Sequence, residues 1–140
     1  MLDKPLIGIN ADFRAASGSQ PSFSVVTAGY FDCITRSGGI PVILPPIESE
    51  DDINQMLDRI DGLVLIGGAD LDPRRDGFMR HPTVRAMDSR REEFDRKIME
   101  AAAERKMLVF GIGVGIQLLN IVMGGNLFFH IPEDLSLIHI

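Results

Sequence analysis

The residues that could do chemistry in this chain gather at a glycine-spaced turn. Residues 109–125 are VFGIGVGIQLLNIVMGG, in which an apolar strand pattern meets three spaced glycines and an amphipathic helix pattern follows. This is the layout of a nucleophile elbow, a tight turn that needs small residues two positions before and after its reactive side chain. Gly111 and Gly115 meet that need around Gly113, which carries no thiol, hydroxyl or base. The spacing therefore predicts an elbow without its covalent chemistry, with the Val114 N–H directed at an oxyanion.

Two other interpretations of this turn stay open. One is a phosphate loop, because a helix N-terminus attracts anions. The G-x-G-x-x-G pattern fails, however, since Ile116 or Leu118 stands where its last glycine belongs, and no Lys follows as in a P-loop. The other is close packing, in which spaced glycines simply let a helix and a strand approach each other. The pattern disfavours the phosphate loop and favours the elbow and close packing equally.

Strand-like and helix-like segments alternate along the chain. Apolar runs predict buried strands, and amphipathic spacing with end signals predicts helices. The predicted strands are residues 5–10, 40–46, 62–68, 107–112 and 126–131. The predicted helices are residues 25–36, 49–60, 89–106 and 116–123, with Ser89 capping the third and Glu92 in its capping-box position. Strands that are apolar throughout predict a parallel sheet buried between helix layers.

Sites in such sheets form in the loops at the carboxyl ends of the strands. In this chain those loops are residues 10–24, 67–88 and 111–115, and the region around Pro45 and Pro46 is a fourth candidate.

Composition and charge restrict the class of protein. The chain has 140 residues, 45% of them hydrophobic, which suits one domain. Its net charge of −6 argues against a nucleic-acid or anionic-membrane partner. No apolar run approaches the roughly 20 residues of a membrane span, and the N-terminus shows no export signal. Cys33 is the single cysteine, so we expect a reducing, cytoplasmic setting. No cofactor and no metal site are predicted.

Several other residues suggest chemistry but have simpler explanations. Cys33 is predicted to be a buried, inert thiol in the middle of a helix rather than a replacement nucleophile. Asp70 and Asp72 are too few for a metal site and fit a solvated or cap-making loop. His81 is predicted to be a loop residue. A basic stretch could meet a carboxylate ligand, but we expect a solvated face paired with neighbouring acids. Its members are Arg74, Arg75, Arg80, Arg85, Arg90 and Arg91.

The sequence resembles a known family over nearly its whole length. VFGIGVGIQLLNIVMGGNLFFHIPEDL is similar to the elbow region of the class I glutamine amidotransferase-like γ-glutamyl hydrolases, most closely the γ-glutamyl-γ-aminobutyrate hydrolase group. KPLIGINADFR, YFDCITRSGGIPVILPP, DGLVLIGGADLDP and RREEFDRKIMEAAAERKMLVFGI match other family stretches in the same order. The resemblance implies a flavodoxin-like α/β fold. It also implies attack by a cysteine thiolate on a γ-glutamyl amide, followed by hydrolysis of the thioester.

The resemblance carries over only in part. Gly113 takes the position of the nucleophile, and Val114 replaces the arginine that follows it. Gly67 and Gly68 match the loop that supplies the other oxyanion N–H, so Gly68 and Val114 are the expected oxyanion donors. Gln117 matches a glutamine that helps to hold the γ-glutamyl group, and Gly67, Gly115 and Gln117 are the expected ligand-binding residues. The base histidine of the family and its acidic partner lie beyond residue 140, and His81 and His130 match other positions.

We therefore expect a catalytically silent homologue that still binds a γ-glutamyl or amino-acid-like ligand. A non-enzymatic ligand-binding or protein-interaction module on the same fold is the alternative, and an exposed sheet face could also support a homo-oligomer. We expect residues 1–134 to be the N-terminal part of the family's domain. Residues 135–140 depart from the family, and one back-translation of them resembles a sequencing adapter. They are expected to be a non-native tail that includes His139, with an ordinary apolar tail as the alternative.

Overall fold

The computed structural model describes residues 3–128 and residue 131. The described part contains the following elements in chain order: β1 (Leu6–Asn10), β2 (Asp12–Arg14), β3 (Phe23–Val25), α1 (Ala28–Arg36), β4 (Ile40–Leu44), α2 (Glu50–Leu57), β5 (Gly62–Leu65), η1 (Pro73–Asp76, a 3-10 helix), α3 (Ser89–Glu104), β6 (Leu108–Gly111) and α4 (Val114–Val122). The predicted tail at residues 135–140 and the predicted domain boundary before it lie outside the described residues.

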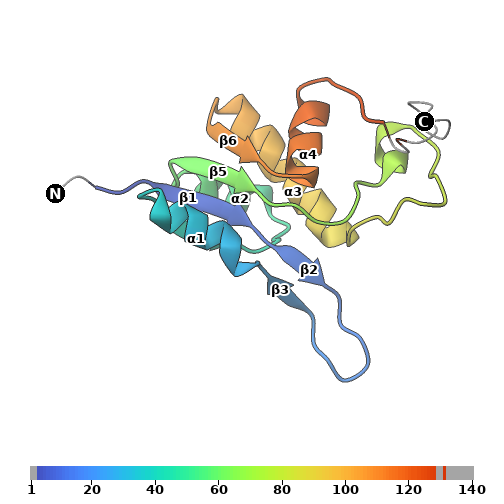
Figure 1. Ribbon diagram of the computed structural model, residues 1–140, viewed down its shortest axis with the longest axis horizontal. Helices are drawn as coiled ribbons and strands as arrows, with labels where there is room; N and C mark the ends of the chain where they lie inside the picture. The colour runs from blue at the N-terminus through green and yellow to red at the C-terminus, as the bar shows by residue number, and fades with distance from the viewer. Residues whose placement is uncertain (1–2, 129–130, 132–140) are drawn as a thin grey trace.

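A four-stranded sheet in the order β4-β1-β5-β6 forms the centre of the fold, and every neighbouring pair in it is parallel. Figure 1 shows α1 on one side of this sheet and α3 and α4 on the other. The predicted parallel sheet between helix layers is therefore confirmed, and it agrees with the flavodoxin-like α/β class. The carboxyl ends of β1, β5 and β6 meet at one edge, so the loops that follow them are neighbours.

The main core lies between the sheet and the layer of α2, α3 and α4. Leu63 and Leu65 of β5 are buried there against Phe94 and Ile98 of α3, together with Leu118 of α4. Adjacent strand residues point to opposite faces, and the register confirms that Leu63 and Leu65 share one face. These strands are apolar on both faces because each face packs, at least in part, on a helix layer.

The opposite face of the sheet is only partly covered. There α1 packs against β4, while β6 stays open, with Leu108 80% and Phe110 66% exposed. A cavity of about 720 Å³ lies between α1 and this open half, lined by Ile7, Val64 and Phe110 among others. Among the described residues, β6 is also an edge strand of the sheet. Exposed apolar side chains beside an open strand edge favour association with another chain.

Two predicted element boundaries are wrong near the N-terminus. Residues 11–24 were expected to be a loop, but β2 and β3 form an antiparallel hairpin that pairs Asp12 with Val25. Figure 1 shows this hairpin reaching away from the sheet. Val25 therefore belongs to β3, and α1 begins only at Ala28. Each hairpin strand has only three residues, too few for a period-two pattern to be visible in the sequence.

The predicted fifth strand is also not found where it can be assessed. Residues 126–128 have no regular structure, and residues 129–130 lie outside the described residues. The apolar run that suggested a strand starts just after Gly124 and Gly125, which follow the end of α4. Periodicity cannot distinguish a short apolar run of this kind from an irregular segment packed on the core. Leu127 indeed packs on the main core.

Across the described residues, none of the helices has the length and apolarity needed to cross a membrane.

We predict that the open half of the sheet face makes the chain associate. Replacing Leu108 and Phe110 together by lysine should raise the fraction of monomer, because charges on an edge strand oppose edge-to-edge pairing. Met79→Lys is the matched control, since Met79 is 92% exposed but lies in a loop away from the sheet. Gel filtration over a range of protein concentrations measures the effect. A wild-type chain that stays monomeric at every concentration would contradict the prediction.

Candidate functional site

The glycine turn is a sharp connection between a strand and a helix. β6 ends at Gly111 and α4 begins at Val114, so the chain turns within Ile112 and Gly113. The Ile112 N–H donates to the Leu65 carbonyl at 2.9 Å, which holds the turn against the end of β5. Gly113 has φ 57° and ψ −118°, a backbone conformation that costs strain for any residue with a Cβ. The geometry is that of the predicted elbow.

The three glycines of the turn serve two different purposes. A Cβ on Gly111 would lie 2.6 Å from the Ile116 nitrogen, and one on Gly115 would lie 2.8 Å from the Leu65 Cβ. Both glycines therefore allow α4 to pack directly on the strands, as the close-packing interpretation expects. A Cβ on Gly113 would meet only the Gly67 Cα, at an ordinary 3.4 Å. The elbow and close-packing interpretations thus each describe part of the turn, and a side chain at position 113 would point toward Gly67.

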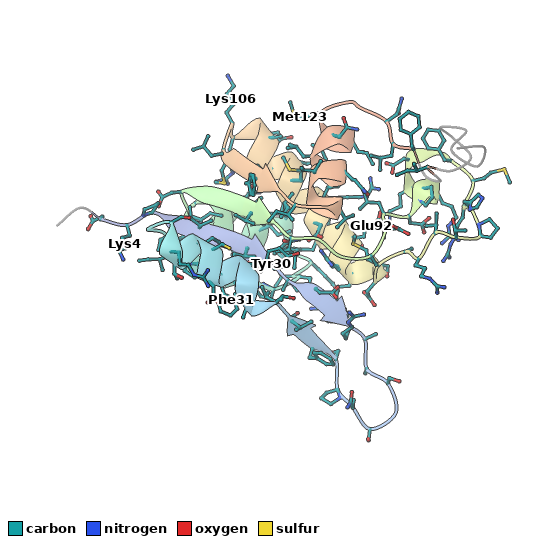
Figure 2. The ribbon with its side chains drawn as sticks, in the orientation of Figure 1. Lys4, Tyr30, Phe31, Glu92, Lys106 and Met123 are labelled. Carbon is teal, nitrogen blue, oxygen red and sulfur yellow. The ribbon has the colours of Figure 1, made fainter. Side chains whose placement is uncertain are left out.

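The loop after β5 lies beside this turn. The Gly67 N–H donates to the Tyr30 hydroxyl at 3.2 Å. Tyr30 comes from the first turn of α1 and is labelled in Figure 2. Among the described residues, neither the Gly68 N–H nor the Val114 N–H meets a hydrogen-bond acceptor. These are the two donors that the resemblance expects to face an oxyanion, and this role stays a prediction.

The expected ligand-binding residues lie in different surroundings. Gln117 is exposed on the first turns of α4, and Gly115 is buried with its N–H donated to the Ile112 carbonyl at 2.9 Å. Gly68 borders a cavity of about 400 Å³ that is also lined by Asp12 and Arg14 of β2. This volume lies within the usual range of small-molecule sites. The structure thus brings the turn and the glycine loop together, while Gln117 reaches solvent beside them.

A buried polar network that the sequence did not predict lies behind the glycine loop. Arg91 of α3 is fully buried and donates from Nε to Asp95 at 3.2 Å and from Nη1 to Asp12 at 3.1 Å. Its Nη2 donates to the Gly67 carbonyl at 3.0 Å. Asn10, at the end of β1, donates to Asp95 at 2.8 Å. The network joins β1, β2, α3 and the loop after β5.

Burial governs the protonation of Asp95 within this network. Loss of hydration raises the pKa of the Asp95 carboxyl to about 6, against an ordinary value of 3.8. The Arg91 charge and the hydrogen bond from Asn10 act in the opposite direction, and the negative charge of Asp12 adds to the rise. One buried guanidinium shared between two carboxylates therefore leaves Asp95 easier to protonate than a solvated aspartate.

Three predictions about single residues are wrong, and each error concerns burial or capping. Arg91 was expected on a solvated face but has no exposed side-chain area. Cys33 was expected to be buried but is exposed, because its side of α1 borders the open cavity. Ser89 was expected to cap α3, but Asp88 is the cap and accepts from the Arg90 N–H at 2.8 Å. Glu92, labelled in Figure 2, is buried and accepts from the Asp72 N–H instead of closing a capping box.

The acidic loop residues act as predicted. Asp72 caps η1 by accepting from the Arg74 N–H at 3.0 Å, and Asp70 accepts from the Arg85 N–H at 2.9 Å. His81 lies in the same loop and contacts Thr83. Within residues 3–128 and 131, no three His, Cys, Asp or Glu side chains are arranged to hold a metal ion.

A positional signal could have identified the buried network in the sequence. Arg91, Asp95, Ile98 and Ala102 recur at spacings of four, three and four, which places them on one face of α3. Ile98 and Ala102 are fully buried core residues. A charged pair on the same stripe as the core residues must then be buried as well, and buried charges need partners.

The similarity of this chain to known proteins agrees with its fold. The chain belongs to the Peptidase C26 family, whose profile matches residues 5–140, and thus to the class I glutamine amidotransferase-like proteins. The resemblance to this family is confirmed.

Several known proteins are similar to this chain, and some of them carry names from this class. A provisionally named glutamine amidotransferase of Mycobacterium tuberculosis is 34% identical over 137 residues, which are 95% of this chain and 44% of that protein. Protein NtpR of Enterococcus hirae is 32% identical over 127 residues, which are 89% of this chain and 53% of that protein. The gamma-glutamyl-gamma-aminobutyrate hydrolase PuuD of Escherichia coli is 26% identical over 140 residues, 99% of this chain and 54% of that protein. The chain spans about half the length of these relatives.

We predict that the turn glycines differ in their tolerance of a methyl group. Gly115→Ala should lower the free energy of unfolding the most, because the Cβ overlaps the Leu65 backbone and helix α4 must move. Gly113→Ala should cost about 1–3 kcal/mol, from backbone strain alone. Gly29→Ala is the control, since nothing lies near its Cβ and alanine favours α1 by about 0.5–1 kcal/mol. Denaturant unfolding of the three variants at low protein concentration measures the order, and equal costs at Gly115 and Gly29 would contradict it.

We predict a pH dependence of stability from Asp95. Its folded pKa of about 6 exceeds the ordinary 3.8, so between these values the folded state holds a proton that the unfolded state has released. The free energy of unfolding of the wild type should therefore fall as the pH rises through this window, relative to Asp95→Asn, and then level off. Asp72 has the opposite effect on the free energy of unfolding, because its hydrogen bonds with Arg74 lower its pKa to about 2. That effect therefore falls in a window at lower pH. Parallel unfolding curves for the two proteins across the window would contradict the assignment.

Proposed function

We propose that this chain binds a γ-glutamyl or amino-acid-like ligand at the elbow without forming a covalent bond to it. The observation that carries the proposal is the sharp strand-to-helix turn at Gly113, the position at which the resemblance to the family expects the nucleophile. A Cβ at position 113 would meet only the Gly67 Cα, and among the described residues the N–H groups of Gly68 and Val114 meet no acceptor. The site thus retains the parts that would stabilise charge and lacks the part that would react.

The loss of covalent chemistry follows from position 113 itself. Thioester formation requires a thiolate, and a base can activate a nucleophile only where one is present. Glycine offers none, whichever residue would act as the base. Cys33, on α1, borders the cavity of the open sheet face and not the cavity beside Gly68. Oxyanion donors without a nucleophile leave only weak residual catalysis.

The surroundings of Gly68 support recognition of a small zwitterion. The cavity of about 400 Å³ beside Gly68 is lined by two carboxylates, Asp12 and Asp88, and by the guanidinium of Arg14, which pairs with Asp12 at 3.0 Å. These groups would complement the ammonium and the carboxylate of an amino-acid head group. The names of several relatives point to the same ligand class, since PuuD of Escherichia coli is named for γ-glutamyl-γ-aminobutyrate and others for glutamine.

We predict saturable binding of γ-glutamyl-γ-aminobutyrate or glutamine by the wild type, with no release of ammonia or amine. Gln117→Ala should weaken this binding about tenfold or more, because it removes a hydrogen bond to a polar ligand. Gln55→Ala is the matched control, since Gln55 is an exposed glutamine on α2. Calorimetric titration measures the binding, and an amine assay measures the turnover.

The thiol requirement is tested separately. In a Cys33→Ser background, a γ-glutamyl electrophile should leave the wild-type turn unlabelled and should label Gly113→Cys once per chain, as seen by mass spectrometry. In the unmodified chain, which keeps Cys33, turnover of a γ-glutamyl amide together with labelling at Cys33 would contradict the proposal that the site is catalytically silent. Absence of saturable binding by any γ-glutamyl compound would favour the alternative, a protein-interaction module.

A further inference from the structure

Most backbone N–H and C=O groups at the start of the loop after β5 form hydrogen bonds with side chains of β1, α1 and α3. The Ile66 N–H donates to the Asn10 side chain at 2.7 Å, and the Gly67 N–H donates to the Tyr30 hydroxyl at 3.2 Å. The Ile66 and Gly67 carbonyls accept from Arg91 at 3.4 and 3.0 Å. The next group along the chain is the Gly68 N–H, which meets no acceptor in the described part of the chain.

The direction of the Gly68 N–H follows from the hydrogen bond between Arg91 and the Gly67 carbonyl. The Gly67 carbonyl and the Gly68 N–H belong to one peptide plane, and the described residues contain no cis peptide bond. In a planar trans peptide the C=O and N–H vectors point in opposite directions. Because the Gly67 carbonyl points at Arg91, the Gly68 N–H must point away from it. The hypothetical Cβ of Gly68 would overlap the Arg91 guanidinium, so only glycine allows the guanidinium to lie this close.

The guanidinium is itself held in place by partners on two sides. Asp95, one helical turn along α3, accepts from Nε, and Asp12 of β2 accepts from Nη1. With these two contacts made, the remaining Nη2 faces the carbonyls of the loop. A lysine in this position would present one flexible ammonium instead of a rigid fork, and could not hold two carboxylates and two carbonyls at once.

We propose that Arg91 is a positioning residue, which fixes the Gly67–Gly68 peptide so that the Gly68 N–H faces the Gly113 turn. The consequence for the ligand rests on the proposed function, because it requires that this N–H and that of Val114 receive an oxyanion or a carbonyl oxygen. The orientation of the peptide itself does not depend on that function. Within the described residues, the polar contacts of Arg91 are with Asp95, Asp12 and the carbonyls of Ile66 and Gly67, so we expect it to act through the peptide.

The test uses the full chain with Cys33→Ser and Gly113→Cys, and compares two reactions of the introduced thiol. Acylation by p-nitrophenyl acetate develops an oxyanion, whereas alkylation by iodoacetamide does not. The ratio of the two rate constants therefore reports oxyanion stabilisation and cancels changes in the thiol's pKa and exposure. Adding Arg91→Lys should lower this ratio about tenfold, since loss of a whole oxyanion donor costs about 100- to 1,000-fold in enzymes.

Arg96→Lys is the matched control on the same helix. Arg96 pairs with Asp76 and Glu92 at 2.8 and 2.9 Å, and its recorded contacts do not include the Ile66–Gly68 backbone. This substitution should leave the acylation ratio unchanged. Circular dichroism and cooperative unfolding establish that both lysine variants are folded. A merely structural role for Arg91 would lower the stability without changing the ratio, and that result overturns the proposal.

Hydrogen exchange of the wild type tests the same orientation without any substitution. The amides of Ile66 and Gly67 should exchange slowly, and the amide of Gly68 should exchange close to the unprotected rate. Strong protection of the Gly68 amide would mean that it points inward and would overturn the proposal. If the Gly113→Cys parent shows no acylation preference over free N-acetylcysteine, the oxyanion pair of the proposed function fails. Exchange at Gly68 then decides the orientation by itself.

Discussion

The buried guanidinium of Arg91 is the constraint on which the arrangement of this edge of the sheet depends. Removing one partner from a buried ion pair lowers the stability of a protein by about 3–5 kcal/mol. The buried Arg91 therefore requires Asp95 and Asp12 within hydrogen-bonding distance. Asp95 fixes the rotation of α3, and Asp12 fixes the start of the β2–β3 hairpin. Asn10 ties the end of β1 to the same cluster. Three regions far apart in the sequence, β1 with β2, the loop after β5 and α3, are therefore joined around a single cation.

The glycines around the site follow from close approach as much as from backbone freedom. Gly68 leaves room for the guanidinium, and Gly111 and Gly115 leave room for α4 on the ends of β6 and β5. Gly8 has the same purpose inside the sheet, since a Cβ there would lie 2.6 Å from the Ile60 side chain. Gly113 is the exception, because its positive φ and open surroundings relate to the turn and not to a packed neighbour.

The sequence predicted the parts of the fold that depend on local pattern. The apolar runs of β1, β4, β5 and β6 and the amphipathic spacing of the helices indicated a parallel α/β sheet, and the turn at Gly113 was placed correctly. It did not predict the hairpin, because β2 and β3 are three residues long and are held by pairing across a long loop. It assigned Arg91 to the surface, because composition alone does not distinguish a buried arginine from five exposed or half-exposed neighbours. Apart from Asp95, which is four residues away on the same helix, the partners of Arg91 lie 79 residues away in β2 and 24 residues away in the loop after β5, separations that no local pattern encodes.

The glycine at position 113 also has a physical consequence for the backbone of the turn. A nucleophile at an elbow sits in a backbone conformation that costs about 1–3 kcal/mol for a residue with a side chain, and the surrounding fold must offset that strain. Glycine adopts φ 57° at little cost, so the turn of this chain keeps its shape without storing the strain. Strained, reactive positions commonly lower stability, and replacing them by relaxed residues raises it. Where a turn of this shape needs no side chain, glycine is therefore the residue that backbone strain favours.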